Sequence, residues 1–441
     1  MAAKDQYWLK SGIINILQNF SATIINIATF YILVRLFDKH DYGVWGIYMQ
    51  AIIILEIVRN GLIQSALIKF MSGAKEKEHS EIISASATIS GIITVLCVIL
   101  TFIFANPLAN ILKAPELAPM FRWYTISFVL SGVLTQMNCI EQANFQYKGV
   151  FASGLVRALI LLIFIVINYF FHFTTSLLVL VYVQFACVVG ALIASYVYVR
   201  PFLHFKYSFN MDWVKKIFDY GKFSFATTVS SILSGTIDQW MLAGMISPVA
   251  SGAFNIAVRI SNLVDIPTNA IATIVFPQSS RRIETEGREA VKYLYEKSVG
   301  TILAIVIPAL IFLYLFDNII IELLAGDKYA DSVPILNITL LYCILSPFGR
   351  QTGVILDSIG KTGVNFAMVI WNTSLILVLN YFFIPKYGVI GAAYATLISN
   401  SIGFITAQIV LYRELKVNAL NTFIYAYRFY PEFLNKYILK K

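Results

Sequence analysis

Apolar stretches of about 22 residues recur along the whole chain, separated by short polar connections. A stretch of this length forms a helix that crosses a bilayer, because each helical residue rises about 1.5 Å and the hydrocarbon layer is about 30 Å thick. The pattern predicts twelve such helices, over residues 12–36, 42–68, 82–105, 119–144, 150–171, 175–199, 222–246, 249–278, 292–316, 333–356, 362–384 and 388–412.

The composition agrees with a membrane protein and excludes most soluble classes. Hydrophobic residues make up 58% of the chain and charged residues 13%, whereas soluble domains carry about 25% charged residues. The four cysteines lie inside apolar stretches without a C-x-x-C spacing, so neither a disulfide framework nor a zinc site is indicated. We therefore predict an all-α integral membrane protein.

Lysine and arginine residues are distributed unevenly between the two sets of loops. With the N-terminus inside, the inner segments hold 23 of them and the outer loops hold 6. Because basic residues are concentrated in cytoplasmic loops, both termini are predicted to be cytoplasmic. The formal net charge of +9 follows from the same bias and requires no nucleic acid as a partner.

The longest inner connection divides the predicted helices six and six. We assign residues 1–205 to an N-terminal bundle, 206–221 to a cytoplasmic linker, 222–416 to a C-terminal bundle and 417–441 to a basic cytoplasmic tail. A shift of 209 residues superposes Glu56 on Asp265 and Asn60 on Asn269, which indicates an internal repeat. Six is an even number, so both halves enter the membrane from the same side, related by a pseudo-two-fold axis along the membrane normal.

Polar side chains lie on one face of the first and second predicted helices of each half. They recur at spacings of three and four residues, which places them on the same side of a helix. Asn26 belongs to this face in the first helix, and Asn255 and Asn262 belong to it in the eighth. These faces predict a water-filled cavity between the two bundles. The alternative is that they only join helices by hydrogen bonds.

Several short motifs resemble those of a known transporter family. They are Arg35-Leu-Phe with Asp41-Tyr-Gly43, Gly61-Leu-Ile-Gln-Ser-Ala-Leu-Ile68, Ile237-Asp238 with Ser251-Gly-Ala-Phe-Asn-Ile-Ala-Val-Arg259, Ala325-Gly-Asp-Lys-Tyr-Ala330, and Pro385-Lys-Tyr-Gly-Val-Ile-Gly391. Together they resemble the polysaccharide-type (Wzx-like) flippases of the multidrug/oligosaccharidyl-lipid/polysaccharide exporter superfamily, over nearly the whole chain.

The resemblance implies the V-shaped, two-bundle fold of that superfamily. It also implies transport of undecaprenyl-diphosphate-linked oligosaccharide units, for O-antigen, capsule or exopolysaccharide, from the cytoplasmic to the outer leaflet of a bacterial inner membrane by alternating access. Membrane lipids, a polysaccharide polymerase and a chain-length regulator are the partners it implies. Two alternatives remain: a drug or cation antiporter of the related multidrug type, and an integral-membrane sugar-modifying enzyme.

Four arginines lie within predicted helices, where each costs about 3 kcal/mol unless it faces water or a partner. A guanidinium group binds phosphate oxygens in a planar two-point geometry, so these residues are candidates for binding the diphosphate. The alternatives are an ion pair between Arg59 and Glu56, and extension of Arg157 and Arg350 to the membrane surface. Arg259 lies near the middle of its helix and is the strongest candidate.

Three carboxylates lie at membrane depth: Asp238, Glu56 and Asp265. They are candidates for coupling transport to a proton or a sodium ion, with charge balance for the arginines as the alternative. No cofactor is expected and no metal site is indicated, because the four histidines are scattered, no D-x-D pair exists and no outer loop exceeds about 20 residues. Pro267, Pro308 and Pro347 mark helices that we expect to be bent.

Overall fold

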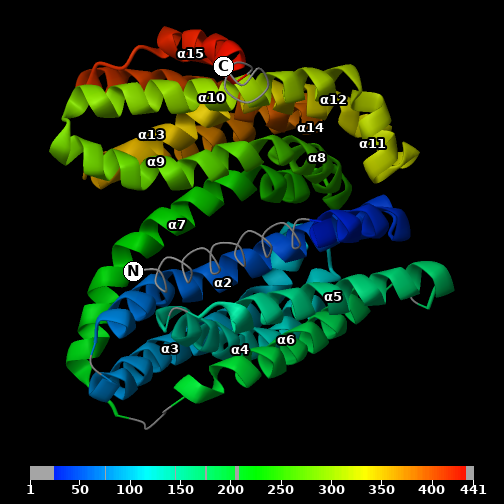
Figure 1. Cartoon of the computed structure of the whole chain (residues 1–441). Coiled ribbons are helices and arrows are strands. Elements are labelled where there is room, and N and C mark those ends of the chain that lie inside the picture. The colour runs from blue at the N-terminus through cyan, green and yellow to red at the C-terminus, as the bar shows by residue number, and fades with distance from the viewer. Residues whose placement is uncertain (1–23, 75, 145, 174–175, 204–207, 434–441) are drawn as a thin grey trace. The chain divides into compact units, whose positions relative to one another are not determined.

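The computed structural model describes residues 24–433, apart from residues 75, 145, 174–175 and 204–207. The described residues are helical and contain no strand (Figure 1). The chain forms two compact units that divide between Ile232 and Leu233. After a helix over Ile24–Leu36, the first unit contains α2 (Lys39–Gly73), α3 (Glu76–Ile111), α4 (Leu117–Ala143), α5 (Lys148–Phe171), α6 (Leu177–Val199) and the start of α7 (Met211–Met245).

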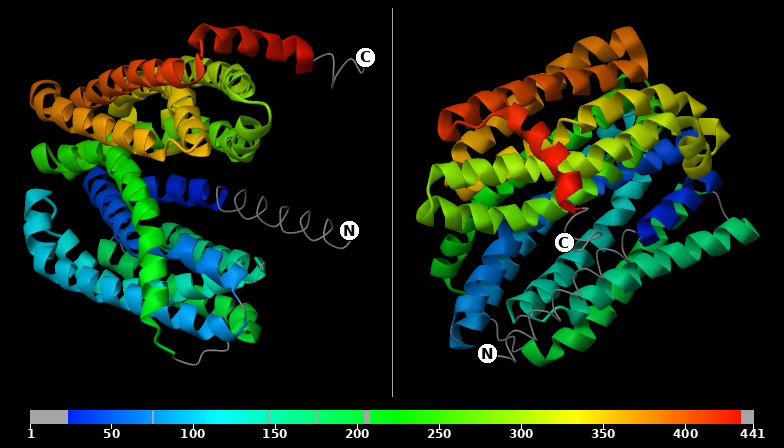
Figure 2. Two further views of the ribbon diagram at one scale, coloured as in Figure 1. Left: turned by 90° about the vertical axis from the view of Figure 1, so that its left-hand side faces the viewer. Right: turned by 45° about the horizontal axis from the view of Figure 1, so that its top comes forward.

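The second unit contains the end of α7 and the remaining helices (Figure 2). These are α8 (Pro248–Ser261), α9 (Asp265–Thr285), α10 (Arg288–Leu315), α11 (Asp317–Ala325), α12 (Val333–Cys343), α13 (Ser346–Ser358), α14 (Thr362–Leu415) and α15 (Ala419–Phe433). Short 3₁₀ turns lie between some of them, over Asn262–Val264 and Asp327–Ser332.

The helices have the length and composition of membrane spans. Within the described residues, seven are long and apolar enough to cross a bilayer, or eight if the bent pair α12 and α13 forms one span. Their outer faces are apolar: on α3 the exposed side chains at helical spacing are Ile92, Leu96, Ile99 and Ile103. Such a surface suits lipid and not water, which confirms the all-α membrane fold. The count of twelve helices stays a prediction.

Two of the predicted helices are broken where proline occurs. The predicted helix over 249–278 is two helices, α8 and α9, separated by the 3₁₀ turn at Asn262–Val264. The predicted helix over 333–356 bends by 41° between α12 and α13. Pro267 and Pro347 follow these breaks, and proline cannot donate to the carbonyl four residues earlier and clashes with it. The expected bend at Pro347 is confirmed, and Pro267 follows a break between two helices.

The helix α14 combines the last two predicted helices, which fold back on each other. Gly388 takes φ 62° and ψ −139° inside it, a conformation that favours glycine. Lys361 and Glu414, at opposite ends of α14, form an ion pair at 3.3 Å, which requires an antiparallel arrangement. A Cβ placed on Gly403 would lie 3.0 Å from Asn372 Oδ1, so the two halves also pack closely near their middle.

The structure describes residues 208–221 of the predicted cytoplasmic linker over 206–221, and these are largely helical and pack on the first unit. The backbone N–H of Ser208 donates to Ser84 Oγ at 3.0 Å, and Asn210 donates to Glu81 at 2.7 Å. Ile217 then belongs to the buried core of that unit, where it lies among residues of α2 and α3. These contacts place the division between the units inside α7, further along the chain than the sequence indicated.

The described part of the predicted basic tail is also structured. Residues Ala419–Phe433 form α15, which packs against α10 (Figure 1). The C-terminal bundle therefore extends beyond the end at residue 416 that the sequence indicated. Tyr425 of α15 and Tyr293 of α10 meet edge to face, with ring centroids 5.7 Å apart.

Candidate functional site

A polar cluster in the first unit joins Glu56 of α2, Tyr124 of α4 and Arg157 of α5. Arg157 Nη2 lies 3.5 Å from Glu56 Oε1, and the Tyr124 hydroxyl donates to the same oxygen at 3.1 Å. The Arg157 side chain is 41% exposed and that of Glu56 22%, while Tyr124 is buried. The cluster therefore presents an accessible guanidinium group with a carboxylate beside it.

Buried aromatic and amide groups support this cluster from behind. The Tyr48 hydroxyl of α2 donates to Gln184 Oε1 of α6 at 2.8 Å, and its ring meets that of Tyr124 edge to face at 6.1 Å. Gln184 in turn donates to Met49 Sδ at 3.1 Å. These contacts fix the side chain of Tyr124 and with it the position of the Glu56 carboxylate. Tyr48, Tyr124 and Gln184 were not predicted from the sequence.

Arg59 does not belong to the accessible cluster. Its side chain is fully buried, and its guanidinium group donates to the Phe128 carbonyl, to Ser131 at 3.1 Å and to Asn60 at 3.0 Å. Gly132 leaves the space for it, since a Cβ there would lie 3.2 Å from Nη1. Glu56 pairs with Arg157 instead. Arg59 therefore joins α2 to α4 and forms no ion pair with Glu56, and its contact with a diphosphate stays a prediction.

A second polar cluster surrounds Asp238 of α7 within the second unit. Asn380, from the first half of α14, donates to Asp238 Oδ1, and Thr396, from the second half, donates to Oδ2 at 2.9 Å. All three side chains are buried. Asn380 Oδ1 is buried without a hydrogen-bond partner among the described residues. The cluster thus holds a buried carboxylate with an amide and a hydroxyl group beside it, and carboxylate oxygens are the ligand type that hard cations such as sodium prefer.

Asp238 was predicted from the sequence, whereas its hydrogen-bond partners Asn380 and Thr396 were not. Asn380 and Thr396 stand within predicted apolar helices, and a polar group at that depth needs a partner. That rule indicates that both side chains have partners. Only the reversal of α14 at Gly388 brings both of them to the Asp238 carboxylate. No group of three or more histidine, cysteine or acidic residues suited to a metal ion occurs in the described part of the chain.

The other predicted site residues of the second unit lie on α8, the turn after it, α9 and α13. Arg259 is exposed, and its Nε donates to Asn255 Oδ1 at 2.9 Å. Asn255 is buried and donates to Gln239 of α7 at 2.6 Å, so the orientation of Arg259 is set from two helices. Asn262, which the sequence placed on the same face, is exposed in the turn after α8.

Asp265 and Glu56, the predicted repeat partners, have similar environments in their own units. Ser346 at the start of α13 donates to Asp265 Oδ1 at 2.6 Å, as Tyr124 donates to Glu56. Arg350 lies one turn further along α13 and is exposed. Each half therefore combines a carboxylate, a hydroxyl donor and an accessible arginine. Asn26, on the helix over Ile24–Leu36, is exposed.

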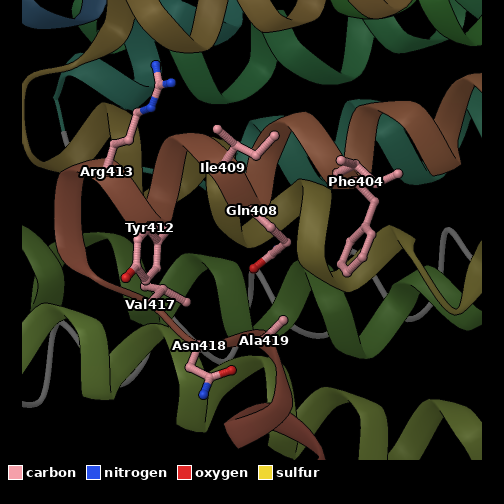
Figure 3. Close-up of a pocket in the computed structure, with 9 residues that line it drawn as sticks. Phe404, Gln408, Ile409, Tyr412, Arg413, Val417, Asn418 and Ala419 are labelled. Carbon is pink, nitrogen blue, oxygen red and sulfur yellow. The ribbon is translucent and has the colours of Figure 1, made fainter.

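A pocket of about 610 Å³ lies where α14 ends and α15 begins. Figure 3 shows Phe404, Gln408 and Tyr412 pointing toward the segment around Asn418, whereas Arg413 points away from it. None of the residues predicted to bind substrate or cation lines this pocket. We therefore do not include it in the candidate site.

Comparison with protein families matches residues 32–334 to a family described as polysaccharide biosynthesis protein. Among curated relatives, the lipopolysaccharide biosynthesis protein WzxC of Escherichia coli is 22% identical over 86% of this chain and 74% of its own length. A putative O-antigen transporter of Shigella flexneri is 22% identical over 87% of this chain and 93% of its own length.

Solved structures give the same fold. An inward-facing multidrug resistance MATE family transporter of the MOP superfamily aligns with a TM-score of 0.77 at 14% identity, covering 90% of this chain and 94% of that one. The lipid II flippase MurJ, in an inward closed conformation, aligns with a TM-score of 0.71 at 17% identity, covering 94% of this chain and 90% of that one.

Proposed function

The chain belongs to the polysaccharide biosynthesis protein family, whose model covers more than half of it, and from this premise we propose that it is a flippase for lipid-linked oligosaccharides. The substrate class is a polyprenyl diphosphate that carries an oligosaccharide repeat unit, moved from the cytoplasmic to the outer leaflet by alternating access. The names of the relatives, which include a lipopolysaccharide biosynthesis protein and an O-antigen transporter, support this proposal.

The observation that carries the proposal is the exposure of three arginines on helices within apolar surroundings. Arg157, Arg259 and Arg350 all have accessible side chains, and the first two are oriented by hydrogen-bonded or ionic neighbours. An arginine in a membrane-spanning unit is costly unless it meets water or an anion. A diphosphate presents pairs of oxygens that a planar guanidinium group binds at two points. We leave Arg59 out of this set because its donors are used within the protein.

The cluster around Asp238 is proposed as the coupling site. A proton or a sodium ion would bind the Asp238 carboxylate, to which the Asn380 amide nitrogen and the Thr396 hydroxyl now donate. The unpartnered Asn380 Oδ1 supports this assignment, since a buried acceptor without a donor is unfavourable unless a cation or a proton satisfies it. Glu56 and Asp265 are the remaining carboxylates at membrane depth, and each already accepts a hydrogen bond from a hydroxyl group.

Substitution of Arg259 tests the substrate contact. Arg259→Lys keeps the charge and loses the two-point geometry, so it should impair surface display of the oligosaccharide nearly as strongly as Arg259→Ala. Arg281→Lys, an exposed arginine at the end of α9, is the matched control and should leave display unchanged. Measurements use cells that lack their own flippase, with protein abundance in the membrane checked for each variant. Full display by Arg259→Ala at normal abundance would sink the assignment.

The orientation in a bacterial inner membrane, with both termini cytoplasmic, is part of the same proposal. It rests on the bias of 23 basic residues to 6 between the two sides. A membrane-impermeant thiol reagent added to whole cells should label a cysteine introduced at Asp327 and not one introduced at Lys75. The reverse labelling pattern would invert the topology. A polysaccharide polymerase and a chain-length regulator are proposed as protein partners.

A further inference from the structure

The C-terminal helix α15 is fixed to α10 at its beginning by a buried carboxylate. Glu296 of α10 is 3% exposed and accepts hydrogen bonds from the backbone N–H of Asn418 at 2.9 Å and from the Asn421 side chain at 3.0 Å. A carboxylate near the first turn of a helix satisfies donors that have no partner within the helix and interacts favourably with the helix dipole. The start of α15 is therefore held at the level of Glu296.

Further along, the two helices touch through their backbones. A Cβ on Gly300 of α10 would lie 2.6 Å from the Thr422 carbonyl oxygen and equally close to Tyr425 Cβ. Real Cβ atoms do not approach other heavy atoms this closely, so only glycine permits the contact. The helix α15 thus stays in close contact with α10 beyond Glu296, while the Tyr425 ring meets Tyr293 on the other side of Glu296.

A third contact lies deeper along α10. Pro308 stands inside that helix and has no N–H, so the Ala304 carbonyl four residues earlier loses its helical donor. The Tyr430 hydroxyl donates to this carbonyl at 2.6 Å. In hydrocarbon an unsatisfied carbonyl is costly, and a side chain from a neighbouring helix is one of the ways in which it is satisfied. The end of α15 therefore completes the hydrogen bonding of a membrane-spanning helix.

The charges of α10 show the depth of these contacts. Lys297 is the last charged residue of α10, and the next charged residue of the chain is Asp317. The uncharged stretch between them is about 28 Å long, close to the thickness of the hydrocarbon layer. Gly300 lies about 5 Å beyond Lys297 and Ala304 about 10 Å beyond it. The Tyr430 hydroxyl therefore reaches well inside the hydrocarbon, whereas Glu432, two residues later, lies within electrostatic reach of Lys297 at the charged end of α10.

The outer face of α15 is apolar as well. Four side chains on it are exposed, namely Leu420 at 70%, Phe423 at 48%, Ile424 at 49% and Tyr427 at 76%. A helix that is apolar both toward its neighbour and away from it is typical of membrane surroundings. Arg428, also exposed, is long enough to extend its guanidinium group back to the headgroups.

We propose that α15 crosses α10 inside the leaflet at the charged end of α10, and that its outer face binds lipid acyl chains. Its beginning contacts Glu296, Glu432 near its end lies within electrostatic reach of Lys297, and the Tyr430 side chain reaches the level of Ala304, about 10 Å inside the hydrocarbon. It then leads the chain toward its basic end, which carries Lys436, Lys440 and Lys441. This inference does not depend on the transported substrate.

Spin labels on single cysteines test the proposal in the full chain. The background replaces the four native cysteines, and the protein is reconstituted into phosphatidylcholine vesicles. Ile424→Cys and Tyr427→Cys probe the outer face of α15. Ile311→Cys, exposed on the uncharged part of α10, is the lipid reference, and Glu289→Cys, whose native side chain is 78% exposed near the charged end, is the water reference.

The measured quantity is the ratio of nitroxide collision rates with oxygen and with a water-soluble nickel chelate. We expect both α15 positions to give a ratio close to that of the Ile311 site and several-fold above that of the Glu289 site, because oxygen concentrates in hydrocarbon. A ratio like that of the Glu289 site would place α15 in water. Low collision rates with both reagents would mean that a protein covers the face. Either result overturns the proposal, and Leu420→Cys replaces a variant that fails to accumulate.

Discussion

Replacement of Asp238 by asparagine removes the charge of the proposed coupling site while its hydrogen bonds can be kept. The oxygen of the introduced amide can accept from Asn380, as Asp238 Oδ1 does now. The amide nitrogen can donate to Thr396 Oγ1, and the Thr396 hydroxyl then donates to the Ala392 carbonyl, which lies 3.0 Å away. We therefore expect Asp238→Asn to fold and to accumulate normally, with a change in unfolding free energy below about 1 kcal/mol.

The functional effect should be large, because in the proposal this one buried carboxylate couples transport to one cation. A single charge that crosses a potential of about 100 mV contributes about 2.3 kcal/mol, which corresponds to about a 50-fold change in the ratio of substrate between the leaflets. In vesicles that contain the protein and a lipid-linked oligosaccharide, imposing a proton or sodium gradient should shift this ratio for the parent protein. For Asp238→Asn the ratio should no longer respond to either gradient.

The matched control is Asp357→Asn at the end of α13, where the carboxylate accepts a hydrogen bond from Asn365 at 3.0 Å. It removes one negative charge from the same unit outside the proposed site, so its gradient response should match that of the parent. If Asp238→Asn transports with its gradient response intact, or fails to accumulate, Asp238 is structural. Glu56 and Asp265 would then be the next residues to test.

Two further substitutions probe packing. Arg59→Lys should lower the unfolding free energy by about 3 kcal/mol, because one ammonium group cannot replace the guanidinium bonds to Phe128, Ser131 and Asn60 together. Thermal unfolding in detergent measures this loss. A loss of unfolding free energy no greater than that of Arg157→Lys, at a half-exposed position, would contradict the expectation. Tyr430→Phe should lower the unfolding free energy by about 1–2 kcal/mol, because it leaves the Ala304 carbonyl unsatisfied. The control Tyr427→Phe, at a 76% exposed position, should keep an unfolding free energy within about 0.5 kcal/mol of the parent. Equal effects of the two substitutions would refute the role of the Tyr430 hydroxyl.

The sequence by itself determined the class of the protein and the places of most of its helices. Hydrophobicity along a membrane helix is a local property, because each span must satisfy its own backbone and face lipid on its own. For the same reason the reversal near Gly388 and the breaks before Pro267 and Pro347 were predictable, since proline and glycine act on the backbone beside them. Motifs over nearly the whole chain also indicated the family.

The tertiary structure decided which polar groups meet, because that depends on residues far apart in the chain. Arg59 and Arg157 look alike in sequence, yet one is buried against Phe128 and the other lies accessible beside Glu56. Hydropathy and charge assigned residues 417–441 to a basic cytoplasmic tail. The structure shows that α15 packs against α10, where Tyr430 satisfies the carbonyl that Pro308 leaves without a donor. A local pattern shows that a polar group needs a partner, and only the packing of helices supplies it.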